Sequence, residues 1–321
     1  MTAVGPFVAS YFRHEVFLYS GAADFVDRAA PIVLRAVAAE EPVLIAIDSA
    51  KMELLRDRLG DVSRAVVWKD IRGVGANPAR IIPLWRRFVN RHATHRRLWG
   101  FGEPIWQGRS PAELVEAQRH EQLLNLAFAD THNFTLLCPY DTELLGVDVI
   151  QEANRSHPLI ADSGGDRTSV DYLGPSTILT TDLPALPEPS EEPAEYAVGT
   201  GNANVRSLLA SHVFAAGLGA ARTDDLTLAI FAVAGGMGRT GAGQVVRVWR
   251  EAGSVLAELR DLRAANDLLA GREWPPPTER AARGLWLANQ VCDLVQMRSV
   301  GKGAVVRLHV TGAHSTAISA W

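Results

Sequence analysis

Cysteine is scarce in this sequence. Its two cysteines, Cys138 and Cys292, lie far apart, and neither belongs to a CxxC pair. This pattern leaves no cysteine-based zinc site and fits a reducing cytoplasm, where disulfides rarely form. The histidines His92, His95 and His120 have no recognisable ligand spacing with carboxylates, so we expect no metal site.

Long apolar runs and basic tracts are absent as well. The first residues, MTAVGPFVASYFRHEVF, have neither a basic segment nor a long apolar core, so we expect no signal peptide and no transmembrane helix. With a net charge of −4 and no basic tract, the chain should not bind nucleic acid directly. These absences predict a cytoplasmic protein that binds neither membrane nor nucleic acid. They do not decide the oligomeric state, and a homodimer is possible.

The length and composition predict two domains. The chain has 321 residues, of which 47% are hydrophobic and 21% charged, so each half can bury an ordinary core. The stretch LPALPEPSEEP at 183–193 is typical of an extended, stiff and solvated connector. We therefore expect a first domain over 1–165, a linker over 166–203 and a second domain over 204–321.

The N-terminal half alternates short apolar runs with longer amphipathic stretches. Strands are predicted at 14–19, 42–47, 65–68, 97–101 and 134–138, with helices between them. This order predicts an α/β domain whose parallel sheet has helices on both faces. A nucleotide-binding version would need GxxxxGK[ST] after an early strand, and neither SGA at 20–22 nor DSA at 48–50 supplies it.

Ligands of such sheets bind at the carboxyl ends of the strands. We expect a partly apolar pocket there, near Tyr19, Trp106 and Tyr140. Each candidate also has an ordinary structural explanation. His120 and Glu121 are adjacent in a helix and point to different faces, so they do not easily line one pocket.

This half resembles the MEDS sensory domain family, named for methanogen and methylotroph regulators, over about residues 10–160. The residues that carry the resemblance are His14 with Tyr19, Gly102-Glu103 with Trp106, His120-Glu121 with Asn125, and Cys138-Pro139-Tyr140-Asp141. The resemblance implies a RecA-like scaffold that has lost its ATPase motifs and senses an unknown small molecule. It implies ligand contacts at His14, Tyr19, Glu103, Trp106, His120, Glu121, Cys138 and Tyr140.

The sequence of the C-terminal half predicts an α+β sandwich. Helices are expected at 204–217 and 223–234, a hairpin of strands at 244–249 and 255–259, a helix from about 280, and a final strand at 304–310. Helices on one side of a mixed sheet give this architecture. Gly235, Gly236 and Gly238 should end the second helix early. Leu294 and Val295 continue the apolar spacing of the third helix, so we expect that helix to include them.

This half resembles the GHKL ATPase family, in particular the bacterial anti-sigma factor serine kinases, over about residues 204–311. The resemblance is carried by Arg283-Gly284-Leu285 and by Cys292-Asp293. It implies a histidine-kinase-ATPase-like GHKL sandwich. A residual nucleotide pocket would use Asp261, Arg283, Gly284 and Leu285.

The family's catalytic pair is missing. Its helix carries a Glu that acts as general base and, one turn later, an Asn that holds Mg²⁺, and the resemblance places Ala232 and Gly236 there. Neither side chain accepts a proton or coordinates a metal. Arg263 and Ala265 replace glycines of the adenine motif. We expect no catalytic residue, no ATP turnover, and weak or absent ATP binding.

The segment GMGRTG at 236–241 matches the dinucleotide pattern GxGxxG, but it follows a helix and precedes a strand, the reverse of the required order. The sequence therefore favours a pseudokinase regulator over an enzyme. Its first domain would sense a small molecule, and its second would bind a protein partner, either a sigma factor or an anti-sigma antagonist. The alternative is an active ATP-dependent anti-sigma serine kinase or histidine-kinase-like enzyme.

Overall fold

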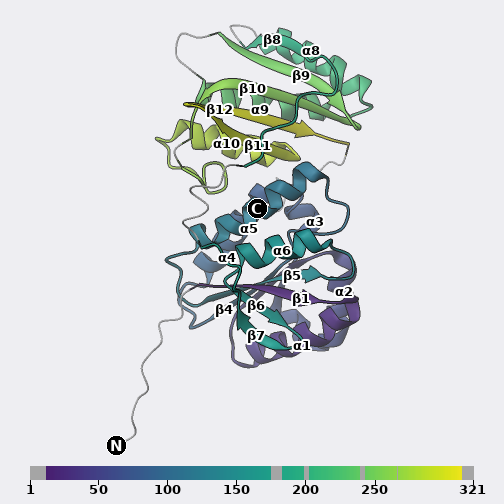
Figure 1. Cartoon of the computed structure of the whole chain (residues 1–321), viewed down its shortest axis with the longest axis vertical. Helices are drawn as coiled ribbons and strands as arrows, with labels where there is room; N and C mark the ends of the chain where they lie inside the picture. Colours follow the sequence, from purple (N-terminus) through teal and green to yellow (C-terminus); the bar gives the residue numbers. More distant parts are fainter. Residues whose placement is uncertain (1–11, 175–182, 199–201, 239–242, 266, 313–321) are drawn as a thin grey trace, which may run out of the picture. The chain divides into compact units, whose positions relative to one another are not determined.

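The computed structural model describes residues 12–174, 183–198, 202–238, 243–265 and 267–312. The chain divides into two compact units, both drawn in Figure 1. Unit 1 comprises Met1–Arg72 and Leu84–Thr180, and unit 2 comprises Gly73–Pro83 and Thr181–Trp321. Unit 2 therefore contains a short segment from the N-terminal half of the sequence.

Unit 1 is built on a seven-stranded sheet in the order β3-β2-β4-β5-β1-β6-β7. All neighbouring strands pair parallel except β6 and β7. The strands are β1 (Arg13–Tyr19), β2 (Val43–Ile47), β3 (Val66–Asp70), β4 (Leu98–Gly102), β5 (Phe134–Asp141), β6 (Leu159–Asp162) and β7 (Gly165–Thr168). This mostly parallel sheet confirms the predicted α/β class.

Helices lie against both faces of this sheet. Phe17 and Tyr19 of β1 pack in one core with residues of the first two helices, whereas His14 faces the fifth. Successive side chains of a strand alternate between faces, which explains this division. The helical segments of this part of the sequence are α1 (Gly21–Ala38), α2 (Ser49–Leu59), η1 (Gly60–Ala65), α3 (Ile71–Val74), η2 (Pro78–Arg80), α4 (Ile81–Arg91), α5 (Pro111–Ala127) and α6 (Val147–Ser156). Of these, η2 belongs to unit 2, and α3 and α4 cross the boundary between the units.

Unit 2 contains a five-stranded sheet in the order β11-β12-β10-β9-β8. It is antiparallel throughout, not mixed as the sequence suggested. Its elements are β8 (Ala194–Val198), α8 (Asn202–Ala215), α9 (Ala221–Met237), β9 (Gln244–Glu251), β10 (Ser254–Arg263), α10 (Arg280–Val291), β11 (Leu294–Val300) and β12 (Gly303–Val310). An apolar core joins the helices to the sheet, which gives the expected α+β arrangement.

Two details of unit 2 differ from the sequence prediction. Helix α10 ends at Val291, and Leu294 and Val295 belong to β11 because Asp293 N–H already donates to the His309 carbonyl, 2.9 Å away. Helix α9 continues through Gly236 to Met237. The low helix propensity of glycine is offset there because α10 packs against the glycine backbone at a distance that excludes a side chain.

The proline-rich stretch lies along the sheet of unit 2. Arg298 Nε donates to the Pro184 carbonyl and Arg307 Nη2 to the Pro187 carbonyl, each at 2.8 Å. The backbone N–H of Arg250 donates to Glu191 Oε1, also at 2.8 Å. The sheet thus binds this segment through arginine side chains and a strand backbone.

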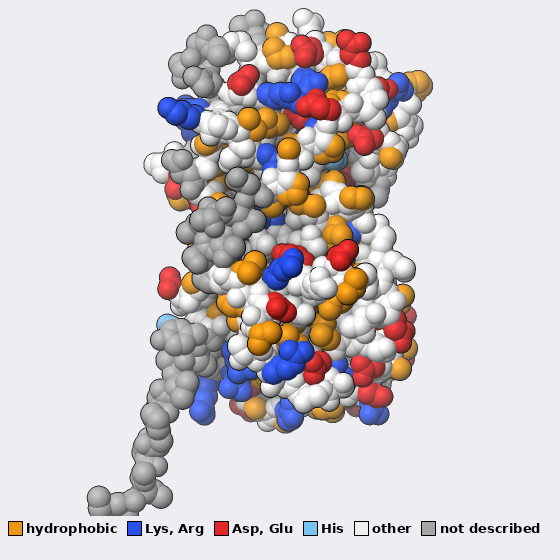
Figure 2. Space-filling model, viewed as in Figure 1, with side chains coloured by type: hydrophobic (Ala, Val, Ile, Leu, Met, Phe, Trp, Pro, Cys, Tyr) orange, Lys and Arg blue, Asp and Glu red, His pale blue; other side chains and the backbone are white. Residues whose placement is uncertain are grey.

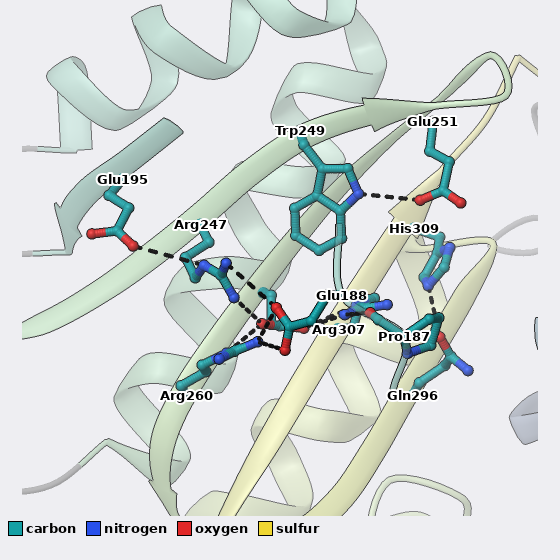
Figure 3. A network of polar contacts seen from close by, with 11 residues as sticks. Pro187, Glu188, Glu195, Arg247, Trp249, Glu251, Arg260, Gln296, Arg307 and His309 are labelled. Carbon is teal, nitrogen blue, oxygen red and sulfur yellow. Dashed lines mark hydrogen bonds and ion pairs between the residues drawn. The ribbon is translucent and has the colours of Figure 1, made fainter. Parts of the chain in front are cut away.

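A buried carboxylate lies on the same face of the sheet. Glu258 accepts hydrogen bonds from Arg247 at 3.1 Å, from Arg260 at 2.6 Å and from Arg307 at 2.9 and 2.6 Å. Figure 3 shows these arginines converging, with Glu188 of the proline-rich stretch beside them. Burial opposes the ionisation of Glu258, but the arginines outweigh it and lower the pKa of the carboxyl.

Acidic and basic side chains are interspersed over the face of the molecule that Figure 2 shows. Among the helices within the described ranges, none combines the length and apolar character needed to cross a bilayer.

Candidate functional site

A cavity of about 420 Å³ opens in unit 1, where β1, β2, β4 and β5 end. Parallel α/β sheets bind their ligands at this edge. The residues that give the cavity its chemical character are Asp48, Lys51, Arg72, Glu103, Trp106 and Asp141. Its volume lies in the range of ordinary small-molecule sites.

A buried polar group forms one wall of the cavity. Lys51 Nζ contacts the Glu103 carboxylate, lies 3.0 Å from Asp48 Oδ2 and donates to the Tyr19 hydroxyl at 2.7 Å. The Tyr19 hydroxyl in turn donates to Glu103 Oε1 at 3.0 Å. Glu103 is 2% exposed, and its second oxygen, Oε2, has no hydrogen-bond partner within the described part of the chain. A buried oxygen of this kind can accept a hydrogen bond from a ligand.

Burial raises the pKa of the Glu103 carboxyl, and the facing ammonium of Lys51 only partly offsets this effect. Burial also raises the pKa of the Tyr19 hydroxyl, and the neighbouring Glu103 adds to the shift. The Tyr19 phenol therefore keeps its proton and serves as a hydrogen-bond donor.

Another part of the cavity lining is aromatic and contains Trp106. The guanidinium carbon of Arg109 lies 3.5 Å from the centre of a Trp106 ring, and that of Arg72 lies 5.1 Å from it. Arg109 Nε also donates to the Pro104 carbonyl at 2.6 Å, which fixes the stack. Burial lowers the pKa of the Arg109 guanidinium to about 9. The cavity lining thus combines an aromatic ring with a buried polar group.

A second group of side chains lies on the other face of the sheet. His14 Nε2 is 3.1 Å from Glu121 Oε2 and 3.3 Å from Cys138 Sγ, and all three side chains are buried. His157, directly after α6, completes the group, and the Tyr140 ring stands edge-on to it with the centroids 5.8 Å apart. Burial opposes the ionisation of Glu121, but His157 and His14 outweigh it and lower the pKa of this carboxyl.

The structure therefore divides the predicted ligand contacts. Tyr19, Glu103 and Trp106 gather at the cavity, whereas Tyr140 pairs in register with Leu18 and faces away from Tyr19. The expectation of one pocket bounded by Tyr19, Trp106 and Tyr140 is wrong because alternate residues of a strand face opposite sides. His120 is fully buried in α5, next to Glu121.

Sequence reasoning missed several of these residues. Asp48 and Lys51 directly follow the buried strand β2, so polar residues at a strand end were an available signal. Arg109 gives no signal in the sequence, since its role is to stack on Trp106. His157 was missed because it leads into β6, a strand too short to be predicted.

The candidate nucleotide residues lie on two elements of unit 2. Asp261 belongs to β10 and has a left-handed backbone, with φ of 55°, at an irregularity between Leu259 and Leu262. The other candidates, Arg283, Gly284 and Leu285, lie in α10. Arg283 Nη2 donates to the Pro277 carbonyl at 2.8 Å, and Leu285 is part of the apolar core.

Gly284 packs directly on α9. A Cβ at Gly284 would lie 2.3 Å from the Ala232 carbonyl oxygen, and a Cβ at Gly236 would lie 2.5 Å from the Arg280 carbonyl oxygen. The predicted resemblance to GHKL ATPases would place the catalytic pair of that family at Ala232 and Gly236. In this chain they bring the backbones of α9 and α10 together.

Residues 13–158 match the MEDS family model, the methanogen/methylotroph DcmR sensory domain. The match confirms the MEDS resemblance and supports a sensing role for this part of the chain, which is less than half of its length. The resemblance of the C-terminal half to GHKL ATPases stays a prediction. No curated protein is similar to the chain.

Proposed function

We propose that the chain is a signalling regulator that binds a small molecule in the cavity at the strand ends of unit 1. The MEDS match supports a sensing role, and the cavity supports the strand ends of unit 1 as the ligand-binding position. The observation that carries the proposal is Glu103 Oε2, a buried acceptor without a partner in the described ranges, beside a cavity lined by Trp106.

The polar group and the aromatic ring indicate the chemical class of the ligand. The free oxygen of Glu103 favours a ligand with a donor such as a hydroxyl or amine, because Tyr19 and Lys51 already donate to Oε1 and leave Oε2 as an acceptor. The Trp106 ring provides a surface for an apolar part of the same molecule, whereas Arg109 and Arg72, which already lie against this ring, disfavour a further cation there. We infer a small organic molecule with an apolar body and a hydrogen-bond donor.

A thermal-shift screen of small alcohols and amines on the full chain tests this assignment. Ligands that stabilise unit 1 should lose at least tenfold in affinity in Glu103→Gln, because the amide presents its NH₂ or a weaker acceptor. Trp106→Ala should weaken the same ligands. Asp61→Asn, an exposed change outside the cavity, is the control. Ligands that bind Glu103→Gln and Trp106→Ala as tightly as the unchanged chain would contradict the site.

For unit 2 we infer a degenerate GHKL-like domain that binds a sigma factor or an anti-sigma antagonist without catalysis. The sequence likeness and the α+β arrangement support this inference. The contacts at Gly236 and Gly284 argue against the kinase alternative, because backbone atoms of the neighbouring helix lie where a catalytic side chain would begin.

Calorimetry with ATP and magnesium, followed by a phosphotransfer assay on proteins that co-purify with the full chain, separates the two alternatives. We expect no phosphotransfer and no magnesium-dependent increase in ATP affinity. Tight magnesium-dependent ATP binding together with phosphorylation of a partner would show that unit 2 is an active kinase and would contradict the proposed non-catalytic regulator.

A further inference from the structure

Four buried side chains of unit 1 direct potential metal ligands towards one point. They are His14 from β1, Glu121 from α5, Cys138 from β5 and His157 after α6, and one donor atom of each lies within 4.8 Å of the others. All four are at most 1% exposed. They come from four separate elements and lie outside the proposed ligand cavity.

The outer nitrogen of each histidine is held by an acceptor. His157 Nδ1 lies 2.8 Å from the Ala153 carbonyl, so Nδ1 carries the proton and donates it. His14 Nδ1 lies 3.1 Å from Asn125 Oδ1, and the Asn125 amide is oriented because its Nδ2 donates to the Ser156 carbonyl at 2.7 Å. Metal-binding histidines typically donate their second N–H in this way.

The inner atoms then present lone pairs to one another. His14 Nε2 faces Glu121 Oε2, and His157 Nε2 lies 2.8 Å from the same oxygen. The His157 nitrogen makes no hydrogen bond at that distance, and Glu121 Oε1 has no partner in the described ranges either. Electron-pair donors that converge in a dry interior need a positive charge between them.

We propose that His14, Glu121, Cys138 and His157 bind a divalent transition-metal ion, with zinc the best match to the ligand set. Zinc takes four ligands of the N, O and S type at about 2.0–2.3 Å in tetrahedral geometry, which places the ligand atoms roughly 3.4–3.8 Å apart. The observed separations of 2.8–3.3 Å between neighbouring atoms, and the upper limit of 4.8 Å, need only small side-chain adjustments.

Charge balance favours a divalent ion. Two neutral imidazoles, one carboxylate and one thiolate carry a charge of −2, so a divalent cation makes the buried site neutral. Binding converts the Cys138 thiol to a metal-bound thiolate and releases its proton to solvent. Since the protein supplies all four ligands, the ion would hold β1, β5, α5 and α6 together and would leave no open position for chemistry.

Metal analysis of the full chain tests the site. Protein purified from zinc-supplemented medium should contain about one zinc per chain. After exchange with cobalt(II), the unchanged chain should show intense visible bands of four-coordinate cobalt and a near-ultraviolet thiolate charge-transfer band. Cys138→Ser should abolish the thiolate band, and His157→Gln should lower the metal content at least tenfold.

Matched controls lie in unit 2. Cys292→Ser changes the other buried free cysteine, and His309→Gln changes a histidine bonded to Gln296, so both should keep the metal and the spectrum. A thiolate band that survives Cys138→Ser, or disappears in Cys292→Ser, would overturn the assignment. If a variant fails to fold, the unchanged chain decides: no cobalt bands and no zinc above background would also overturn it.

Discussion

At the scale of single residues, Glu258 contributes strongly to the stability of unit 2. We predict that Glu258→Gln destabilises unit 2 by about 3 kcal/mol at pH 7, because three arginines lose the carboxylate that balances their charge. Chemical denaturation followed by circular dichroism measures the loss. Glu195→Gln is the control, since Glu195 is exposed and lies 3.7 Å from Arg247, and it should change stability by less than about 0.5 kcal/mol.

The same carboxyl predicts a pH dependence. Its pKa is lowered in the folded chain, so its contribution is present above the unfolded value of 4.5 and is lost as the pH falls through the folded value. The unchanged chain should therefore lose part of the stability of unit 2 in acid below pH 4.5, and Glu258→Gln should lose less. Parallel stability curves for the two proteins between pH 7 and acid would refute the assignment.

Residue roles were predictable only where the chemistry is local or the family is recognised. Tyr19, Glu103 and Trp106 were predicted as ligand contacts because they lie at or after the ends of strands, where ligands of parallel sheets bind, and the structure places Glu103 and Trp106 in the cavity lining, with Tyr19 hydrogen-bonded to Glu103. That Tyr140 lies away from this site could not be predicted without knowing the register between β1 and β5. His157 joins His14 through tertiary structure alone, so no spacing in the sequence indicates the group.

At the scale of elements, the contact between α9 and α10 depends on glycine. We predict that Gly236→Ala destabilises unit 2 by about 1–3 kcal/mol, because the new methyl group would lie 2.5 Å from the Arg280 carbonyl oxygen. Gly235→Ala is a matched control in the same helix. A Cβ there meets nothing within 4 Å, so it should be neutral or stabilise by up to about 1 kcal/mol. Equal effects of the two changes in thermal melts would exclude close packing as the reason for Gly236.

The same contact tests the predicted GHKL resemblance. The catalytic pair implied by that resemblance would require Ala232→Glu and Gly236→Asn, and the asparagine would begin where the backbone of Arg280 lies. We predict that this double variant loses stability and gains no ATP turnover, as measured by phosphate release. Turnover in a variant that stays folded would show that α9 and α10 separate easily.

Most elements were predictable from hydrophobic periodicity. The first five strands of unit 1 have apolar runs and were located to within about two residues, the usual uncertainty of such boundaries, except that β5 continues three residues past the predicted end to Asp141. β6 and β7 were missed because each has four residues and β7 is exposed. Leu294 and Val295 fit a helical and an extended pattern equally well, so the start of β11 depends on its pairing with β12.

At the scale of the whole molecule, unit 2 is discontinuous in sequence. Asn77 and Arg80, both at most 2% exposed, are part of unit 2 and form hydrogen bonds with Asn289 and Cys292. Asn77 Nδ2 donates to Asn289 Oδ1 at 3.1 Å, and Arg80 donates to the Asn289 and Cys292 carbonyls at 2.7 and 2.8 Å. The proline-rich stretch is thus one of several connections between the halves of the sequence.

A fragment that lacks Asn77 and Arg80 should show how much these residues stabilise unit 2. We predict that a fragment of residues 181–321 folds but is less stable than unit 2 in the intact chain by at least about 3 kcal/mol, because it lacks these buried hydrogen bonds. Arg80→Leu in the intact chain should give a loss in the same direction. Denaturation curves of the three proteins measure both effects, and a fragment as stable as unit 2 in the intact chain would show that Asn77 and Arg80 contribute nothing.

The central claim is that the chain senses a small molecule at the strand ends of unit 1, and hydrogen–deuterium exchange on the full chain with and without a screened ligand tests it most directly. We predict slower exchange in the segments that contain the residues lining the cavity, which are 21–22, 48–51, the vicinity of Arg72, 103–107 and 141–145. Glu103→Gln should remove this protection at the same ligand concentration. Protection confined to residues outside these segments, or unchanged in Glu103→Gln, would contradict the account.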